Sequence, residues 1–134
     1  MDRLHERLTV AERALATLRE LAQRLQPTAV ERDAAIKRFE YSVDATWKAV
    51  QQFLRTLEGI DVGSPKGTIR ACREAGLLSD AEAAQALAMT DDRNLATHTY
   101  NEELAKALYA RLPGHLALLD AWVAAMARRV APSS

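Results

Sequence analysis

The sequence predicts an all-α fold, an up-and-down antiparallel bundle of four main helices with short extra helices. Ala and Leu are abundant and aromatic residues make up only 5% of the chain, a composition that favours helix. Apolar residues recur at helical spacing along most of the sequence, and no segment has the pattern of a strand. A length of 134 residues fits one domain, so we expect residues 1–134 to fold together.

The first predicted helix covers residues 4–25. Its apolar residues are spaced alternately by four and three positions, so they share one face of the helix. These residues are Leu4, Leu8, Ala11, Leu15, Leu18, Ala22 and Leu25. Pro27 ends this helix, and Thr28 with Glu31 forms a capping-box pattern that begins the next one.

The second predicted helix, residues 29–57, is the longest, and Gly59 is suited to end it. Its apolar stripe is Ile36, Phe39, Val43, Thr46 or Trp47, Val50, Leu54 and Leu57. The very short turn before it predicts an antiparallel hairpin, which is half of a bundle. Because Trp47 and Trp122 both lie on apolar stripes, we expect them in the core or at a dimer interface.

Residues that favour the start or the end of a helix mark the bounds of the remaining predicted helices. Ser64 followed by Pro65 begins a short helix of about residues 65–75, which Gly76 ends.

A second capping box at residues 79–82 opens a helix that ends somewhere between residues 93 and 98. A further helix covers about residues 100–112 and is stopped by Pro113, and a last one covers about residues 114–130.

The balance of basic and acidic residues excludes one class of function. The chain has 18 basic and 18 acidic residues, so it is not as a whole an electrostatic binder of nucleic acid. Any RNA contact would depend on a local basic cleft. No apolar run approaches the length of a membrane span, and the charged N-terminal segment is not a signal peptide. We therefore expect a cytoplasmic protein without membrane contacts.

The single cysteine and the scattered histidines predict no redox or metal site. Cys72 has no partner for an internal disulfide and lies in an apolar helical pattern, so we expect a small core residue. His5 and His115 lie far from His98 in the sequence, with no metal-ligand spacing among them. We accordingly expect neither a metal ion nor a cofactor.

A densely polar stretch, residues 91–102, lies between two predicted helices. Arg93 is a permanent cation whose planar fork matches phosphate oxygens. His98 can take or give a proton near neutral pH, Asn94 can donate and accept hydrogen bonds, and Tyr100 supplies a hydroxyl group. These side chains suit phosphodiester chemistry, but a solvated turn with a capping histidine explains the same residues, so the residue types alone leave both interpretations open.

The spacing within this stretch restricts how it can act. Arg93 and His98 are five residues apart, so on an unbroken helix their side chains point about 140° away from each other. They meet at one phosphate only if the helix breaks near His98 or if two chains combine across a dimer interface. A break is supported by a third capping-box pattern, with Thr99 as the cap, Tyr100 at the first helical position and Glu102 at the third.

Arg93, Asn94, His98 and Tyr100 have an order and spacing that resembles the Arg-x4-His-x-Tyr signature of HEPN proteins of the HepT type. The resemblance extends to the nucleotidyltransferase substrate-binding protein family over most of residues 36–110. The segments that carry it are residues 39–48, 64–65, 69–78 and 92–105. One departure is Asp44, where that family usually has Glu.

The resemblance implies a HEPN-like bundle that forms a homodimer, with the paired motifs lining a cleft between subunits. It also implies a minimal nucleotidyltransferase (MNT) antitoxin as partner. In the toxin–antitoxin members, the HEPN protein is a metal-independent ribonuclease, which the MNT silences by attaching AMP to the motif tyrosine, here Tyr100. His98 would then act as general base on a ribose 2′-OH, Arg93 would stabilise charge on the phosphoryl oxygens, and Asn94 would orient the phosphate or the imidazole.

Two other functions stay open at this point. The chain is alternatively a non-catalytic subunit that binds a nucleotide or presents a substrate to the nucleotidyltransferase, which suits its neutral charge, or it is a purely structural bundle. Arg70, Arg73, Lys48 and Thr99 are candidates to line the cleft, although solvated surface positions explain them as well.

Overall fold

The computed structural model describes residues 1–99 and 101–130, and in these residues all regular structure is helical. The elements are α1 (Asp2–Leu21), α2 (Ala29–Phe53), the π-helical turn η1 (Leu54–Glu58), α3 (Pro65–Glu74), α4 (Asp80–His98) and α5 (Glu102–Val130). The predicted all-α class is confirmed.

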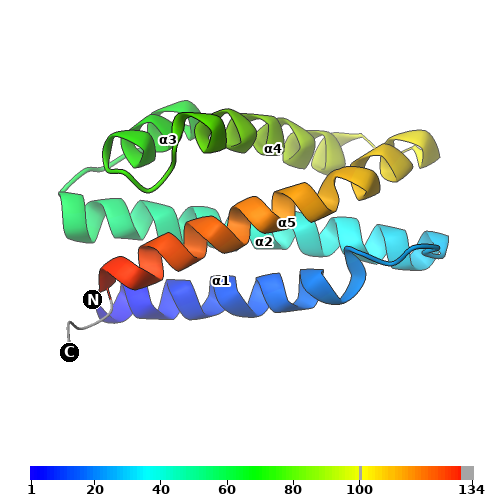
Figure 1. Cartoon of the computed structure of the whole chain (residues 1–134), viewed down its shortest axis with the longest axis horizontal. Helices are drawn as coiled ribbons and strands as arrows, with labels where there is room; N and C mark the ends of the chain where they lie inside the picture. Colours follow the sequence, from blue (N-terminus) through cyan, green and yellow to red (C-terminus); the bar gives the residue numbers. More distant parts are fainter. Residues whose placement is uncertain (100, 131–134) are drawn as a thin grey trace.

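Figure 1 shows α1, α2, α4 and α5 along the long axis of the molecule, with successive long helices running in opposite directions. The short helix α3 lies beside the start of α4, at the end of the bundle where α2 finishes. The predicted hairpin of the first two helices is present. No helix in the described part of the chain is both long and apolar enough to span a membrane.

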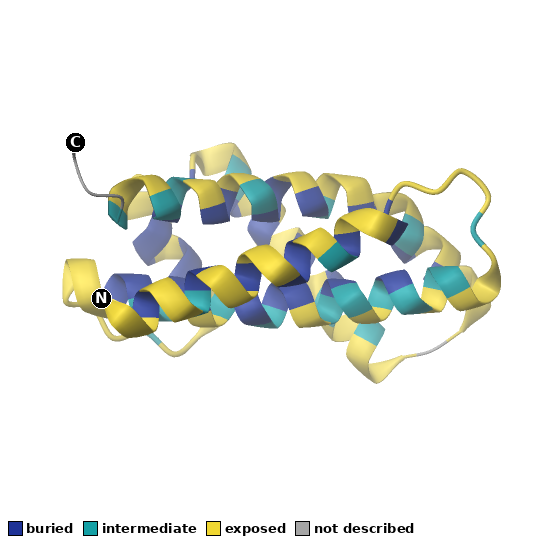
Figure 2. Cartoon of the chain, turned by 90° about the horizontal axis from the view of Figure 1, so that it is seen from below, coloured by how far each residue is buried: buried dark blue, intermediate teal, exposed yellow. Residues whose placement is uncertain are grey.

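The core runs between the four long helices, where the buried residues of Figure 2 face inward. Its largest fully buried side chains include Trp122, Phe39 and Phe53. The ring of Trp47, which is partly buried, packs edge-on against Trp122 with centroids 6.2 Å apart. Cys72 is buried in the same core, and burial raises the pKa of its thiol to about 12, so it is not a nucleophile at neutral pH.

The starts of α2, α3 and α4 follow the local signals of the sequence. The predicted capping boxes at Thr28 and Ser79 are both formed, each closed by the Glu three residues later. Ser64 caps α3 by accepting the backbone N–H of Gly67 at 3.1 Å. Gly59 ends η1 in the left-handed conformation, with a φ of 66° that a glycine adopts without strain.

The ends of the first two helices differ from the prediction. α1 stops at Leu21 rather than at residue 25, and Leu25 is 98% exposed. The Tyr109 hydroxyl on α5 donates to the carbonyl of Leu21 and accepts the N–H of Arg24, so it satisfies backbone groups at this helix end. The wider turn of η1 rotates Leu57 out of the predicted stripe, and it is 40% exposed.

The prediction that Pro113 separates two helices is wrong. A single helix, α5, runs from Glu102 to Val130 with Pro113 inside it. Proline removes one backbone hydrogen bond and costs about 3 kcal/mol in a helix interior. Leu112 and Leu116 on either side are buried in the core, and burying each such side chain contributes about 1.5–3 kcal/mol. Tertiary packing therefore outweighs the local penalty.

Candidate functional site

Arg93 lies on the side of α4 that faces α2, where Asp44 holds it. The guanidinium makes a two-pronged contact: Nε donates to Asp44 Oδ1 at 3.1 Å and Nη2 donates to Oδ2 at 3.0 Å. These hydrogen bonds raise the pKa of Arg93, and the charge of Glu40 adds to the effect. The Arg93 side chain is 28% exposed, so the cation is fixed in orientation yet accessible from solvent.

A second polar contact joins α2 to α4 one turn further along. Glu40 lies one turn before Asp44 on α2, and Thr97 lies one turn after Arg93 on α4. The Thr97 hydroxyl donates to Glu40 Oε1 at 2.9 Å. Two acidic side chains of α2 therefore fix the last two turns of α4. Neither acid was predicted to take part, because each lies about fifty residues from its partner in the sequence.

Asn94 and His98 lie on a different face of α4. Both are exposed, and their spacing of four residues places them one turn apart on the same side. The helix ends at His98, as expected, but it is unbroken from Arg93 to His98. The angle of about 140° between these two positions therefore persists, and one chain does not direct both side chains at the same point.

The connection to α5 differs from the predicted capping box. Thr99 is extended, with φ −139° and ψ 122°, and it does not cap α5. The cap is Asn101, whose Oδ1 accepts the backbone N–H of Leu104 at 2.7 Å. α5 accordingly begins at Glu102. Tyr100, predicted to be the modified residue, lies outside the described residues.

The other candidate residues line different grooves of the bundle. A small groove of about 160 Å³ is lined by Asp44, Arg93 and Asn94, with Trp47 and Pro65 among its walls. We call it the Arg93 groove.

Lys48 lines a larger groove of about 430 Å³ between α1 and α2, and Asp44 lines this groove as well. We call it the α1/α2 groove. Arg70 and Arg73 line a groove between α3 and α4 that does not include Arg93. Thr99 lines a further groove between α2 and α5. Of the four predicted cleft-lining residues, the structure thus brings only Lys48 into a groove that borders the Arg93 site.

A charged cluster on the side of α4 that faces α5 was not predicted from the sequence. Asp92, only 7% exposed, accepts hydrogen bonds from Arg111 Nε and Nη2, both at 2.8 Å, and its Oδ2 lies 2.7 Å from His115 Nε2. Burial alone raises the pKa of Asp92, but these hydrogen bonds outweigh it and lower the pKa below its usual value. The spacing of four between Arg111 and His115, which places both on one face of α5, was the available signal.

The histidine ring of that cluster is also packed in the core. His115 stacks on Phe39 with ring centroids 5.2 Å apart and an angle of 18° between the planes. Within residues 1–99 and 101–130, no three His, Cys, Asp or Glu side chains are grouped to hold a metal ion.

A comparison with known protein families gives a match over most of the chain. The family model described as nucleotidyltransferase substrate binding protein like matches residues 6–128. The chain belongs to this family. The family resemblance noted in the sequence is therefore confirmed. No curated protein matches the chain.

Solved structures with the same fold come from three bacteria. A protein of Thermus thermophilus is 55% identical, with a TM-score of 0.83 over 87% of this chain and 98% of that one. HI0074 of Haemophilus influenzae, described as a substrate-binding domain of a nucleotidyltransferase, is 25% identical, with a TM-score of 0.72 over 89% of this chain and 98% of its own.

The third structure is a tri-AMPylated HEPN toxin of Shewanella oneidensis in complex with its MNT antitoxin. It is 13% identical to this chain, with a TM-score of 0.77 over 96% of this chain and 98% of its own. The chain therefore has the HEPN toxin fold.

Proposed function

We propose that the protein is a HepT-like toxin, a metal-independent endoribonuclease that an MNT antitoxin silences by transferring AMP to Tyr100. The observation that carries this proposal is the placement of the motif. Arg93 is held in a fixed orientation by Asp44, while Asn94 and His98 stand on the exposed surface of α4. A purely structural role would not require a histidine and an amide that both face solvent.

The face of α4 that carries Asn94 and His98 also has exposed apolar side chains, which favour the expected homodimer. Leu87 and Leu95 are 39% and 41% exposed, and both lie on the side of α4 that carries Asn94 and His98. A two-fold contact along this face would bury both leucines and would bring His98 from two copies to one cleft. It would also supply the Arg93 and His98 pairing that a single helix does not provide.

The reaction that we propose uses the substrate's own nucleophile. His98 removes the proton of a ribose 2′-OH, whose oxygen attacks the adjacent phosphorus, and the P–O5′ bond breaks. The leaving 5′-oxygen needs a proton, which His98 of the second copy donates. Arg93 stabilises the negative charge on the phosphoryl oxygens, and Asn94 orients the phosphate by hydrogen bonds.

Cleavage of RNA by purified protein tests the mechanism. Replacing His98 by Ala is expected to lower cleavage by at least about a hundredfold, which is the contribution typical of a general base. His98 is exposed, so the variant should unfold at the same temperature as wild type. His5→Ala, which removes an exposed histidine of α1, is the matched control and should cleave normally. Full activity of the His98→Ala variant in a clean preparation would refute the mechanism.

Intact mass after incubation with the MNT partner and ATP tests the regulation. The Tyr100 oxygen would bond to the α-phosphorus of ATP with loss of pyrophosphate, so the mass should rise in AMP-sized steps. Tyr100→Phe has no hydroxyl and should show no step at this position. A modified protein is expected to lose RNA cleavage, because the added phosphate repels an RNA backbone.

A second candidate function is a non-catalytic binding subunit that presents a nucleotide or substrate to the nucleotidyltransferase. The description of HI0074 as a substrate-binding domain favours it, as does the net charge of zero. A stable complex with the nucleotidyltransferase, combined with no mass gain and no RNA cleavage, would favour this candidate over the toxin.

A further inference from the structure

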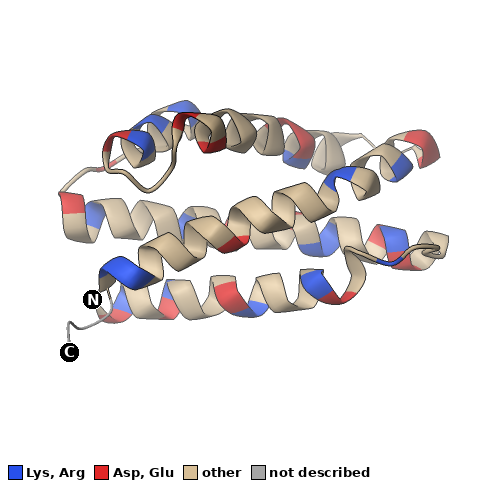
Figure 3. Ribbon diagram, in the orientation of Figure 1, with Lys and Arg blue, Asp and Glu red and all other residues tan. Residues whose placement is uncertain are grey.

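Most basic residues of this protein already have an acidic partner. Arg19, Arg38, Arg55, Arg93 and Arg111 are among those that form ion pairs with Asp or Glu. Figure 3 shows the two signs of charge interspersed along the helices. A surface cation that is already paired attracts an anion less strongly than an unpaired one does.

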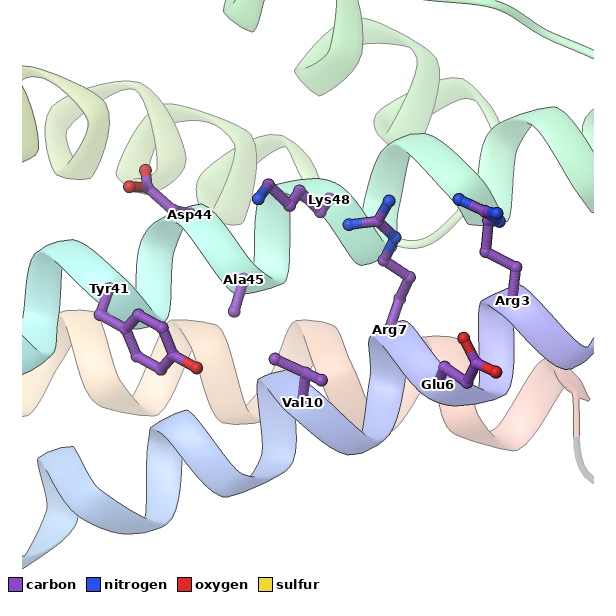
Figure 4. Close-up of a pocket in the computed structure, with 8 residues that line it drawn as sticks. All are labelled: Arg3, Glu6, Arg7, Val10, Tyr41, Asp44, Ala45 and Lys48. Atoms are coloured by element: carbon purple, nitrogen blue, oxygen red, sulfur yellow. The ribbon is translucent and has the colours of Figure 1, made fainter.

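The α1/α2 groove departs from this pattern. It is lined by Arg3 and Arg7 from α1 and by Lys48 from α2. Within the part of the chain that the structure describes, none of these three cations forms an ion pair. Figure 4 shows Arg3 at one end of the groove, Arg7 one turn further along α1, and Lys48 near the middle of the groove. The groove therefore gathers three cations without ion-pair partners, although Glu6 and Asp44, which also line it, reduce the positive charge.

The other end of the same groove has an exposed aromatic ring, and Asp44 lies on the same side. Tyr41 on α2 is 55% exposed, and Val10 on α1 is 43% exposed. Figure 4 places Tyr41 at the end away from Arg3 and Val10 near the middle, level with Lys48. Seven residues separate Tyr41 from Lys48 on α2, as they do Arg3 from Val10 on α1, so each of these pairs spans about 10 Å along its helix. A volume of about 430 Å³ lies within the range of small-ligand sites.

The groove is also continuous with the candidate site. Asp44 lines both the α1/α2 groove and the Arg93 groove. It is half-exposed, and its two oxygens are already directed at Arg93. A ligand in the α1/α2 groove would thus lie directly beside the Arg93 cation, on the face of the bundle formed by α1, α2 and α4.

We propose that the α1/α2 groove binds a short stretch of single-stranded RNA, with a base on Tyr41 and the phosphates on Arg3, Arg7 and Lys48. Every base has a face that stacks on an aromatic ring, and unpaired cations bind phosphates by releasing counterions. The choice of RNA rests on the proposed function, and the groove would hold the strand beside the phosphate that Arg93 contacts. A free mononucleotide has the same chemistry and is distinguished by experiment.

Binding measured without cleavage tests this inference separately from the ribonuclease mechanism. Fluorescence anisotropy of a labelled single-stranded oligoribonucleotide is recorded on His98→Ala protein, which leaves the strand intact. In that background, Arg7→Gln with Lys48→Gln should weaken binding about tenfold at low salt and should reduce the slope of log K against log salt by about 1.4. Tyr41→Ala should weaken binding about tenfold, whereas Tyr41→Phe, which keeps the stacking ring, should bind as the parent does.

The control removes the same charge elsewhere. Arg13→Gln with Lys66→Gln, both exposed residues outside the α1/α2 groove, should change binding less than twofold. AMP titrated against the same variants identifies the source of the nucleotide. Oligonucleotide binding that the groove variants lose, with no binding of AMP, supports the RNA assignment. AMP binding that the same variants abolish overturns RNA as the preferred ligand. Equal effects of the groove and control variants overturn the site itself, whether or not the wild type cleaves RNA.

Discussion

Two neighbouring residues of α4, which carry opposite charges, point about 100° apart around the helix and meet different helices. Asp92 points towards α5, where Arg111 and His115 enclose it, and Arg93 points towards α2, where Asp44 holds it in a half-open groove. Both pairs have two-pronged geometry, but they differ in burial. In the first pair the carboxylate is the buried member, and in the second pair the carboxylate is half-exposed, so we expect the first pair to contribute more to the stability of the fold.

The largest effect on stability is expected at Asp92. Its replacement by Ala removes the acceptor of two guanidinium hydrogen bonds and leaves the largely buried His115 without its carboxylate partner. We expect a loss of about 3 kcal/mol in the free energy of unfolding, measured by urea denaturation. A loss under about 1 kcal/mol would mean that the two sides of α4 do not differ as argued.

Acid should weaken this cluster before the rest of the fold is affected. Because the folded protein lowers the pKa of Asp92, the carboxylate contributes its stability above the usual Asp pKa of about 3.9, and this contribution is lost as the pH falls through the lowered value. The difference in unfolding free energy between wild type and Asp92→Asn should therefore be constant near neutral pH and shrink below about pH 4. Urea titrations at a series of pH values measure it, and a difference independent of pH would contradict the assignment.

The contrast between the two clusters also shows what the sequence can and cannot predict. Capping boxes at Thr28 and Ser79 were predictable because each joins residues only three positions apart. The Arg93 to Asp44 and Asp92 to Arg111 contacts join residues 49 and 19 positions apart. Periodicity places each residue on a face of its helix, but only packing decides which helix that face meets.

Local signals fail where tertiary packing overrides them. Pro113 is a strong helix breaker, yet the buried leucines around it keep α5 continuous. Thr99 fits the capping-box pattern, yet Asn101 caps α5. The motif residues Arg93, Asn94 and His98 were found by spacing and resemblance, whereas Asp44, the residue that orients the arginine, was noticed only as a departure from the family pattern.

A smaller effect is expected on the α2 side of α4. Asp44→Ala and Arg93→Ala each break the half-exposed pair, and exposed pairs contribute only about 0.2–1 kcal/mol. A double-mutant cycle measured by urea denaturation should return a coupling energy in this range. The exposed Arg19 and Asp120 pair, 2.6 Å apart, is a matched control and should give a similar value. A coupling above about 2 kcal/mol would show that the Arg93 pair supports the fold as Asp92 does.

The smallest effects on stability should belong to Asn94 and His98, which are exposed and lie on the open face of α4. Each replacement by Ala is expected to change the free energy of unfolding by no more than about 0.5 kcal/mol. The same replacements should cause the largest losses of RNA cleavage, because in the proposed mechanism these side chains act on the substrate and make no contact with the core. Unfolding and cleavage measured on the same preparations test this inverse order. If His98→Ala instead destabilises the protein as strongly as Asp92→Ala, its loss of activity would reflect a damaged fold, and the histidine would belong with the structural cluster on the α5 side.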